Sequence, residues 1–382
     1  MGRSRAGLGD ARVRVLCAPN AFKGTLTAAA AAEALAAGVR DAGGEARALP
    51  MADGGDGTLD TLLAASPAAR VDLHRVSGPL GGRLVARLGW IDATTAVVEL
   101  AEAAGLRRLG GRREALRATS RGVGELIVRA LDGGARRIVV GIGGSACTDG
   151  GGGLLSALGA RLFDRNGHLL RDGGGALVAL ARAELGGLDP RLRLCRVEVA
   201  ADVTSPLLGG RGAAAVFAPQ KGATPAEVRR LEAGLRRLAA VLERDAGVPP
   251  ALRRAAGAGA AGGCGYGLAV AGAILLPGAP LVAHAVDLDR AISEAELVIT
   301  GEGRLDRQTS SGKAPIEVAR RSARAGIACV AVAGVVESVP KGFHHAVALA
   351  EVARPGEEPE RVPRRLLRRA AARIVRDAAG GG

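Results

Sequence analysis

The sequence predicts an α/β protein with two α/β domains, a Rossmann-like parallel-sheet domain interrupted by an inserted mixed α/β domain. At both ends of the chain, short apolar runs alternate with helical segments, which is the pattern of a parallel sheet covered by helices. The middle holds closely spaced runs separated by Gly/Pro turns, as in antiparallel strands. Glycine- and acid-rich patches follow many of these runs, at the sheet edge where open α/β folds bind ligands.

The first predicted domain is discontinuous and takes residues 1–78 plus 285–382. Its early elements are a strand at 13–18, a helix at 27–42, a strand at 46–50 and a helix at 59–65. Its late elements are strands at 297–300, 329–333 and 346–350, with a helix at 314–325.

The inserted domain is predicted to take residues 79–284. Antiparallel strands are expected on both sides of its start, at 71–76 just before residue 79 and at 84–91 and 96–100 after it. Then come a helix at 120–131, a strand at 137–142, a helix at 154–161, a strand at 195–200 and a long charged helix at 225–245.

Composition indicates a globular protein with an aliphatic core. Hydrophobic residues make up 48% of the 382 residues and aromatic residues only 2%, so Ala, Val and Leu must fill the interior. The five cysteines show no spacing typical of a zinc site or a disulfide framework, which suits a reducing cytoplasm. We see neither a secretory signal in residues 1–12 nor an uncharged membrane-spanning run, so a cytoplasmic protein without membrane contact is expected.

The net charge of +14 raises the question of a nucleic-acid partner, and part of it lies in the arginine-rich segment 361–376. Leu366, Leu367, Ala370 and Ile374 fall on one helical face of this segment. An amphipathic helix docked on the protein body is favoured over a nucleic-acid-binding arm, because no aromatic residues are interleaved for base stacking. We therefore expect no nucleic-acid partner. The sequence does not fix the oligomeric state, and a homo-oligomer stays open.

The last patch, at 297–315, carries the most chemistry. An apolar strand runs into a loop with Glu302 and Asp306, and Lys313 follows at a predicted helix start. Carboxylates hold a metal or accept a proton, and lysine neutralises phosphate. Carboxylates and a lysine in this arrangement are suited to phosphoryl transfer. Ala314 and the glycine spacing rule out a standard P-loop.

The first two patches, at 18–25 and 50–58, also follow predicted strands. Lys23 is placed to reach a phosphate or a substrate carboxylate, with a surface lysine on a turn as the alternative. Asp53 and Asp56 lie among glycines, as in a loop that binds magnesium or a hydroxyl group. For Asp56, capping of the next helix is an equal alternative.

The patch at 141–153 places glycines and hydroxyl groups between a strand and a helix. Backbone N–H groups cradle anions at such a helix start. Gly143, Gly144, Ser145 and Asp149 are therefore phosphate-site candidates, with close helix–strand packing as the alternative. Cys147 is interpreted as a small filler rather than a nucleophile.

Two further patches lie at 201–209 and 217–224. Asp202 follows a predicted strand, a good position for a proton acceptor. Gln220 and Lys221 precede a helix that Thr224 is expected to cap; a solvated lysine is the alternative for Lys221. The G-x-G-x-x-G match at 257–262 follows no strand, so we reject a dinucleotide site and expect either a backbone-rich loop over the ligand or tight packing.

Taken in order, these patches resemble the bacterial glycerate kinase family. The family pattern is approximately A-P-D-S-F-K-G-S, P-M-A-D-G-G-E-G-T, G-G-S-A-T-x-D-G-G, D-V-x-N-P-L, G-P-Q-K-G-A, G-A-G-A-A-G-G and T-G-E-G-x-x-D-x-Q-T…G-K-x-P. The matched blocks span residues 18–315 in one order. Departures include Asn20-Ala21 for Asp-Ser, Asp56 for Glu, and Thr204-Ser205 for x-Asn. Asn20 removes a charge and Ser205 an amide, which leaves the substrate preference open.

The resemblance implies ATP-dependent phosphorylation of D-glycerate, with 2-phosphoglycerate as product and the active site in a cleft between two α/β domains. Mg²⁺ is expected on some of Asp53, Glu302 and Asp306. The lysines 23, 221 and 313 are expected to offset charge on the γ-phosphate and the glycerate carboxylate. Either Asp202 or Asp306 is expected to accept the proton of the attacking hydroxyl group, and the sequence does not rank them.

Three other interpretations remain open from the sequence. The acceptor could be another small hydroxy acid, or the 3-hydroxyl of glycerate. From another functional class, the protein could be a catalytically silent regulator that binds glycerate or a nucleotide and uses its basic tail on nucleic acid. The retained lysines and carboxylates argue against such a regulator.

Overall fold

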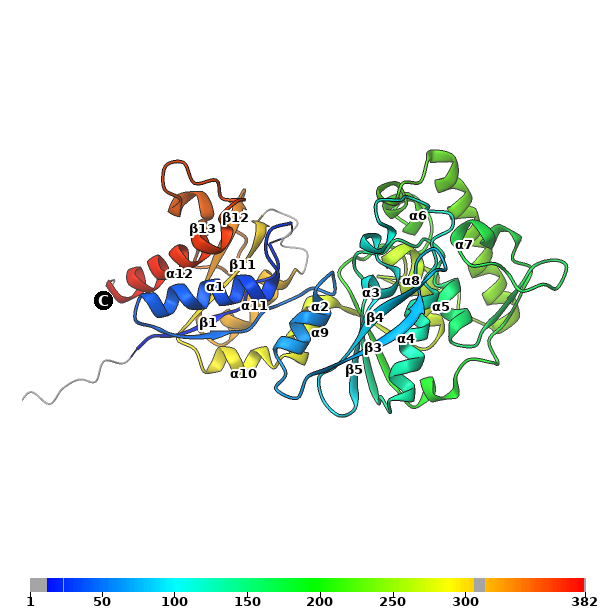
Figure 1. Ribbon diagram of the computed structural model, residues 1–382, viewed down its shortest axis with the longest axis horizontal. Helices are drawn as coiled ribbons and strands as arrows, with labels where there is room; N and C mark the ends of the chain where they lie inside the picture. Colours follow the sequence, from blue (N-terminus) through cyan, green and yellow to red (C-terminus); the bar gives the residue numbers. More distant parts are fainter. Residues whose placement is uncertain (1–11, 23, 306–312, 381–382) are drawn as a thin grey trace, which may run out of the picture. The chain divides into compact units, whose positions relative to one another are not determined.

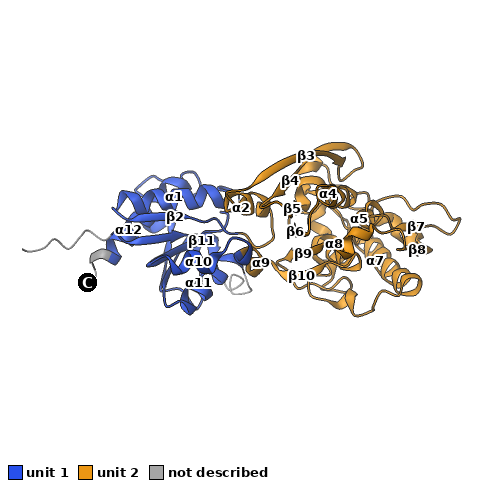
Figure 2. Ribbon diagram, turned by 90° about the horizontal axis from the view of Figure 1, so that it is seen from below, with its two compact units in different colours: residues 1–51, 283–382 blue, residues 52–282 orange. Residues whose placement is uncertain are grey.

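The computed structural model describes residues 12–22, 24–305 and 313–380. Its chain divides into two compact units (Figure 2). Unit 1 comprises residues 1–51 and 283–382, and unit 2 comprises residues 52–282. Unit 1 is therefore built from two separate stretches of sequence, and unit 2 from one continuous stretch.

Unit 1 contains a five-stranded sheet in the order β13-β12-β11-β1-β2 (Figure 1). Every neighbouring pair in this sheet is parallel, as expected for the ends of the chain. The strands are β1 (Arg14–Cys17), β2 (Glu45–Ala48), β11 (Leu297–Leu305), β12 (Ala328–Val336) and β13 (His345–Ala348).

The helices of unit 1 are α1 (Ala28–Asp41), α10 (Leu288–Ser293), α11 (Ala314–Arg324) and α12 (Pro363–Gly380), with a 3₁₀ turn at Leu349–Val352. α1 and α12 pack against each other (Figure 1). Leu366, Leu367, Ala370 and Ile374 are all buried in the core that α12 shares with α1 and the sheet. The arginine-rich tail is thus a docked amphipathic helix, as the spacing of its apolar residues predicted.

Unit 2 contains a six-stranded mixed sheet in the order β10-β9-β6-β5-β4-β3. The β3–β4 and β4–β5 pairs are antiparallel, whereas β5, β6, β9 and β10 are parallel. Its strands are β3 (Arg70–Ser77), β4 (Arg83–Trp90), β5 (Thr95–Glu99), β6 (Arg137–Gly141), β9 (Arg196–Ala201) and β10 (Ile274–Pro277), and β7 (Arg161–Phe163) pairs with β8 (Arg182–Glu184) in a separate ribbon.

The helices of unit 2 surround a core rich in Leu, Val and Ala. They are α2 (Thr58–Ala64), α3 (Leu100–Ala104), α4 (Arg121–Asp132), α5 (Gly152–Ala157), α6 (Ala213–Phe217), α7 (Pro225–Ala246) and α8 (Ala260–Val270); α9 (Gly278–Ala285) crosses into unit 1. Short 3₁₀ turns occupy Leu106–Leu109, Gly174–Ala179, Pro190–Arg193, Pro219–Lys221 and Leu252–Arg254.

Local sequence signals explain where α7 begins and where α5 ends. Thr224 caps α7, since its hydroxyl oxygen accepts the Glu227 N–H at 3.3 Å, and Pro225 occupies the first turn. The helix expected at 154–161 ends early, at Ala157, and Gly159 adopts a φ of 108°. Left-handed backbone of this kind ends a helix, so Arg161 begins strand β7 instead.

The expected domain boundary at residue 78 is wrong. The segment 52–78 belongs to unit 2, because β3 pairs with β4 along its full length from Arg70↔Trp90 to Ser77↔Arg83. β3 is therefore an edge strand of the second sheet rather than part of the first. The return boundary lies at residue 283, close to the expected 285.

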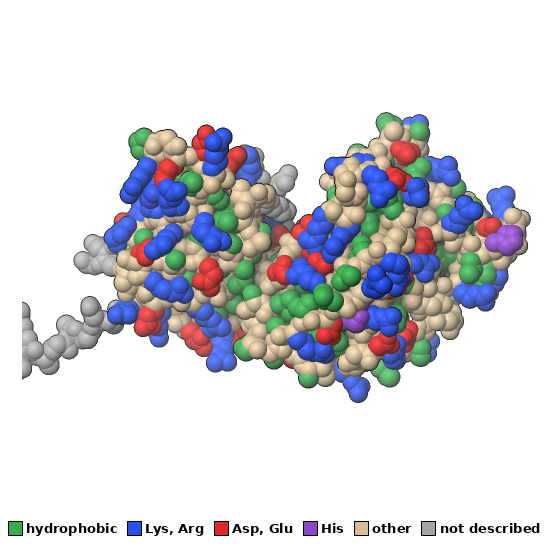
Figure 3. All heavy atoms as spheres, viewed as in Figure 1, with side chains coloured by type: hydrophobic (Ala, Val, Ile, Leu, Met, Phe, Trp, Pro, Cys, Tyr) green, Lys and Arg blue, Asp and Glu red, His purple; other side chains and the backbone are tan. Residues whose placement is uncertain are grey.

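Acidic and basic side chains are interspersed over the molecular face drawn in Figure 3. Basic side chains on that face do not form one continuous stripe. Among the described residues, none of the helices combines the length and apolar character that a membrane span requires.

Candidate active site

Several sequence patches of unit 2 meet at the carboxyl edge of its sheet. β6 ends at Gly141 beside β9, which ends at Ala201. The segment 52–57 lies against these strand ends: the Gly143 N–H donates to the Gly54 carbonyl oxygen at 3.1 Å. This is the edge of an open α/β sheet where ligands bind.

Glycine is required where this segment lies on the sheet. Gly54 has a φ of 93°, and a Cβ there would lie 2.5 Å from the Ala200 carbonyl oxygen. A Cβ on Gly278 would likewise collide with the Asp53 carbonyl oxygen. The missing side chains allow the backbone around Asp53 to sit directly on the strand ends.

The two carboxylates of this loop differ in environment. Asp53 is buried, and one of its oxygens accepts the Gly55 N–H at 3.3 Å. Asp56 is exposed. Its carboxylate lies against the backbone of Gly144 in the neighbouring glycine loop, which is residues 142–151 between β6 and α5. Asp53 is therefore fixed by its own loop, whereas Asp56 faces solvent beside the predicted phosphate site.

Glu99 organises the same loop and was missed from the sequence. It ends β5, is 1% exposed, and its Oε2 accepts the N–H groups of Gly57 at 3.1 Å and Leu59 at 3.0 Å. Burial raises the pKa of Glu99, although these hydrogen bonds and the nearby Arg107 oppose the rise. Gly57 offers no side-chain cap to α2, so Glu99 supplies it. A carboxylate ending an apolar strand was the available signal.

The Lys221 side chain packs against the interior side of the glycine loop. It is only 1% exposed, and its Nζ donates to Ser145 Oγ at 2.8 Å and to the Cys147 carbonyl oxygen at 2.5 Å. Burial lowers the pKa of Lys221. These contacts exclude the solvated-lysine interpretation and place a cation next to the predicted phosphate loop.

Asp149 joins the glycine loop to two helix starts. It is 1% exposed, and one oxygen accepts from the Ser120 N–H at 2.8 Å, the Ser120 hydroxyl at 2.9 Å and the Gly153 N–H at 3.2 Å. The other oxygen accepts the Gly151 N–H at 3.2 Å. Burial raises the pKa of Asp149, opposed by these hydrogen bonds. Its geometry is that of an anchor for α4 and α5 rather than of a group that meets a phosphate.

The glycine-rich segment 257–263 packs against the same loop. Ala261, Gly262 and Gly263 all have left-handed backbone, with φ of 54°, 69° and 90°. A Cβ on Gly262 would collide with the Cys147 carbonyl oxygen, and the Gly150 N–H donates to the Gly262 carbonyl oxygen at 3.0 Å. Of the two interpretations weighed from the sequence, this geometry supports tight packing.

The other two candidates of unit 2 are exposed. Asp202 directly follows β9 and is accessible to solvent. Gln220 is also exposed, and its backbone carbonyl oxygen accepts a hydrogen bond from the Arg113 guanidinium. Both side chains can therefore meet a ligand from solution.

In unit 1, the carboxyl end of the parallel sheet brings together two of the predicted patches. The Asn20 N–H bonds the carbonyl oxygen of Gly301 at 2.8 Å, so the first patch runs beside β11. Glu302 is buried, and its Oε2 lies 3.6 Å from Lys313 Nζ. Lys313 is the residue before α11, whose first turn contains Pro315. The structure thus pairs the carboxylate and the lysine of the last patch.

Lys23 and Asp306 lie outside the described residues. For Mg²⁺, the described carboxylates fit by donor chemistry: Asp53 and Glu302 offer hard oxygen ligands, and each lies in a loop or strand at the carboxyl edge of its own sheet. The ion pair with Lys313 shows that Glu302 already has a cation as neighbour.

The sequence of this chain is similar to the sequences of known proteins. The model of the glycerate kinase family matches residues 15–379. A glycerate kinase of Bacillus subtilis (strain 168) is 44% identical over 329 residues, covering 85% of each chain. A glycerate 2-kinase of Escherichia coli (strain K12) is 42% identical over 328 residues, covering 84% of this chain and 85% of the relative.

A solved structure extends the likeness to the fold. The crystal structure assigned to glycerate kinase 2 of Salmonella typhimurium LT2 has a TM-score of 0.85 and 40% sequence identity. The match covers 97% of this chain and 99% of the other chain. The similarity therefore includes both units and the patches in each of them.

Proposed function

The chain belongs to the glycerate kinase family, and on that premise we propose that it transfers the γ-phosphoryl group of ATP to the 2-hydroxyl of D-glycerate. The products are 2-phosphoglycerate and ADP. The protein is a phosphotransferase with an alcohol group as acceptor. The choice of hydroxyl is supported by the 42% identity to a relative named glycerate 2-kinase.

One observation carries the proposal: a glycine-rich loop and a buried lysine lie together at the carboxyl edge of a sheet. The loop follows β6, which ends at Gly141, and the Lys221 ammonium group holds it through hydrogen bonds to Ser145 Oγ and the Cys147 carbonyl oxygen. Phosphoryl transfer depends mainly on positioning and charge neutralisation, which such a site supplies.

We assign binding of the ATP phosphates to the backbone N–H groups of Gly144 and Ser145; Gly143, whose N–H donates to the Gly54 carbonyl oxygen, fixes the start of the loop. Gln220, exposed beside Lys221, is assigned to polar contact with the ligands. Lys23 and Lys313 are assigned to the charges of the γ-phosphate and the glycerate carboxylate. Lys221 and Asp149 are assigned to positioning the loop, because both side chains are buried and form hydrogen bonds with it.

Mg²⁺ would be held by some of Asp53, Glu302 and Asp306. The metal ion would neutralise charge that develops on the phosphate oxygens during transfer. The remaining task is removal of the proton from the attacking hydroxyl group. We assign it to Asp202 or Asp306; Asp202 is exposed at the carboxyl end of β9, where it can reach a bound substrate.

Replacing the proton acceptor tests this assignment. We expect Asp202→Asn to lower kcat by about 10²–10⁴-fold with little change in the KM for ATP, because only the proton transfer is lost. Asp132→Asn, which changes an exposed carboxylate at the end of α4, is the matched control. If Asp202→Asn retains more than about a tenth of wild-type kcat while Asp306→Asn does not, Asp306 is the acceptor.

The five cysteines are free and buried, which supports a reducing compartment, and we place the enzyme in the cytoplasm. Substrate choice is tested by coupled ADP release with D-glycerate and a panel of small hydroxy acids. Turnover confined to D-glycerate is expected. A preference for a different hydroxy acid would instead link substrate choice to Asn20 or Ser205, where the chain departs from the family pattern.

A further inference from the structure

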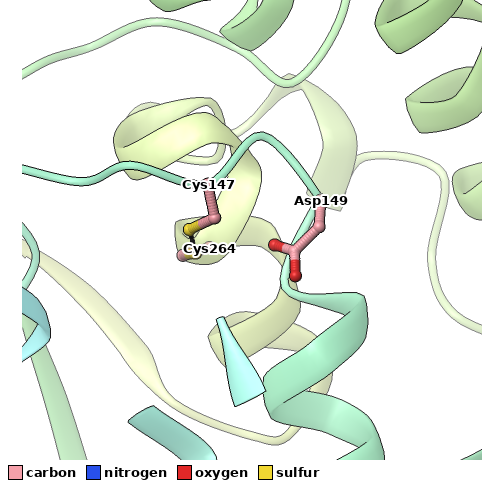
Figure 4. A group of neighbouring side chains, drawn as sticks. All are labelled: Cys147, Asp149 and Cys264. Atoms are coloured by element: carbon pink, nitrogen blue, oxygen red, sulfur yellow. Dashed lines mark hydrogen bonds between the residues drawn. The ribbon is translucent and has the colours of Figure 1, made fainter. Parts of the chain in front are cut away.

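Two thiols face each other within the packing between the glycine loop and α8. The Sγ atoms of Cys147 and Cys264 lie 3.5 Å apart and are both fully buried (Figure 4). Cys147 belongs to the glycine loop, and Cys264 lies in α8 just after the left-handed residues 261–263. The pair therefore joins two segments that are far apart in sequence and that support the same predicted phosphate site.

Distance alone would also allow a metal ion here, since ligand atoms of Cys147, Asp149 and Cys264 all lie within 4.8 Å of one another. The surroundings disfavour a cation. The Asp149 carboxylate already accepts N–H groups from both helix starts and a hydroxyl group. The ammonium group of Lys221 bonds the Cys147 carbonyl oxygen and brings a positive charge to the cluster.

We propose that Cys147 and Cys264 form an oxidation site whose disulfide switches off the kinase. The oxidant is a hydroperoxide. One thiol attacks the peroxide oxygen to give a sulfenic acid and water, and the second thiol then displaces a second water to form the S–S bond. For hydrogen peroxide, two thiols and one peroxide give one disulfide and two waters, so two electrons pass from the sulfurs to the peroxide.

The disulfide would distort the site because the two backbones already touch. An S–S bond is about 2.05 Å long, so the Sγ atoms must approach from 3.5 Å. Gly262 packs on the Cys147 carbonyl oxygen, and a Cβ on Gly263 would lie 2.7 Å from the Gly150 Cα. Because the backbone is packed this closely, we expect closure to shift the glycine loop and to displace the Cys147 carbonyl oxygen that accepts from Lys221.

The environment of the two thiols determines the rate of their oxidation. The hydrogen bond with Cys147 and burial raise the pKa of Cys264 well above its ordinary value, and a thiol reacts through its thiolate. Oxidation is consequently slow and requires sustained exposure to peroxide. Such a slow, reversible pair suits a protein of a reducing compartment, where disulfides are transient.

The Cys147–Cys264 disulfide is detected by a measurement that does not depend on enzyme activity. The purified full-length protein is treated with hydrogen peroxide, its remaining thiols are alkylated, and tryptic peptides are analysed by mass spectrometry. Trypsin releases Cys147 in peptide 138–161 and Cys264 in peptide 255–290. We expect these two peptides as a cross-linked pair that dithiothreitol separates, and a fall from five free thiols to three in the denatured protein. Absence of the pair after prolonged oxidation overturns the proposal.

The switch depends on the proposed function only for its activity readout. Wild-type enzyme should lose most of its ADP release on oxidation and recover it in dithiothreitol. Cys264→Ala should keep its activity under the same treatment, whereas Cys329→Ala, which removes a buried thiol of unit 1, should be inactivated like wild type. Equal inactivation of Cys264→Ala, or full activity of the cross-linked enzyme, contradicts the switch. No turnover in the reduced enzyme counts against the proposed function, while the cross-linked peptides still report on the thiols.

Discussion

The environment of Lys221 differs from the one that its sequence context indicates. In sequence it sits in a polar loop between Gln220 and Gly222, yet its ammonium group is buried against Ser145 Oγ and the Cys147 carbonyl oxygen. Burial of a charge is unfavourable unless hydrogen bonds compensate, and its lowered pKa reflects that cost. We infer that the chain retains this cation to hold the glycine loop.

Lys221→Met tests that inference, because methionine keeps much of the side-chain length but donates no hydrogen bond. Two buried acceptors lose their donor, so we expect a loss of about 1–3 kcal/mol in the free energy of unfolding and a fall in kcat. Urea unfolding and coupled ADP release measure the two effects. Wild-type stability together with wild-type kcat would show that the ammonium group does not hold the loop.

At the residue scale, the sequence identified most of the candidate positions but not their roles. Asp149 and Lys221 were proposed from glycine-rich patches, but whether a side chain faces a ligand or the interior depends on contacts from distant segments, such as Ser120 on Asp149. Glu99 was missed for the same reason: its partners, Gly57 and Leu59, lie far away in sequence.

At the element scale, the loop before α2 offers a matched pair of glycines. Gly54 and Gly57 have nearly the same left-handed φ, 93° and 90°. A Cβ on Gly54 would meet the Ala200 backbone at 2.5 Å, whereas nothing lies within 4 Å of a Cβ on Gly57. Both alanine variants carry the same backbone strain, of order 1 kcal/mol, and only Gly54→Ala adds a steric collision.

We therefore expect Gly54→Ala to be less stable than Gly57→Ala in urea unfolding and to lose far more activity, since its collision displaces the loop that carries Asp53. The difference between the two variants isolates the contact from the backbone strain. Equal losses would mean that the loop does not rest on the strand end as described.

The attachment of α12 predicts a pH dependence of stability. Hydrogen bonds from Arg369, together with the Arg354 N–H, lower the pKa of Glu357 from 4.5 to about 2. Between these values the unfolded chain binds more protons than the folded chain, so stability rises with pH. The contribution is complete above about 4.5 and disappears as the pH falls through about 2.

Glu357→Gln should consequently lower the melting temperature at neutral pH, and the gap to wild type should close as the pH falls from about 4.5 toward about 2. Glu358→Gln, which removes the exposed partner of Arg361, should have little effect, as for most surface ion pairs. Thermal unfolding by circular dichroism across this pH range measures both. A gap that persists unchanged at the acid end would disprove the assigned contribution.

Elements were largely predictable because their signals are local. The apolar spacing of α12 and the capping residues of α7 both lie within a few positions in sequence. The early end of α5 was not predicted, since Gly159 was not recognised as a helix terminator. The helical stretch of α8 was hidden by left-handed residues that packing against the glycine loop stabilises.

At the scale of the whole molecule, alternation of strands and helices predicted a parallel sheet from the two ends of the chain and a mixed sheet from the middle, and the topology agrees. The boundary at residue 78 failed because strand pairing decides which sheet receives β3, and pairing partners are not encoded locally. The sequence patches that predicted functional groups lie in both units. The resemblance to a family therefore rested on patches along most of the chain, which made it more informative than any single motif.

Product identification tests the proposed transfer of phosphate to D-glycerate most directly. The reduced, purified protein is incubated with D-glycerate and MgATP, ADP release is followed, and the product is analysed by ³¹P NMR. We expect sustained turnover with 2-phosphoglycerate as the product. Formation of 3-phosphoglycerate would contradict the assigned hydroxyl group, and absence of turnover by a folded, ATP-binding protein would contradict the proposed glycerate kinase activity itself.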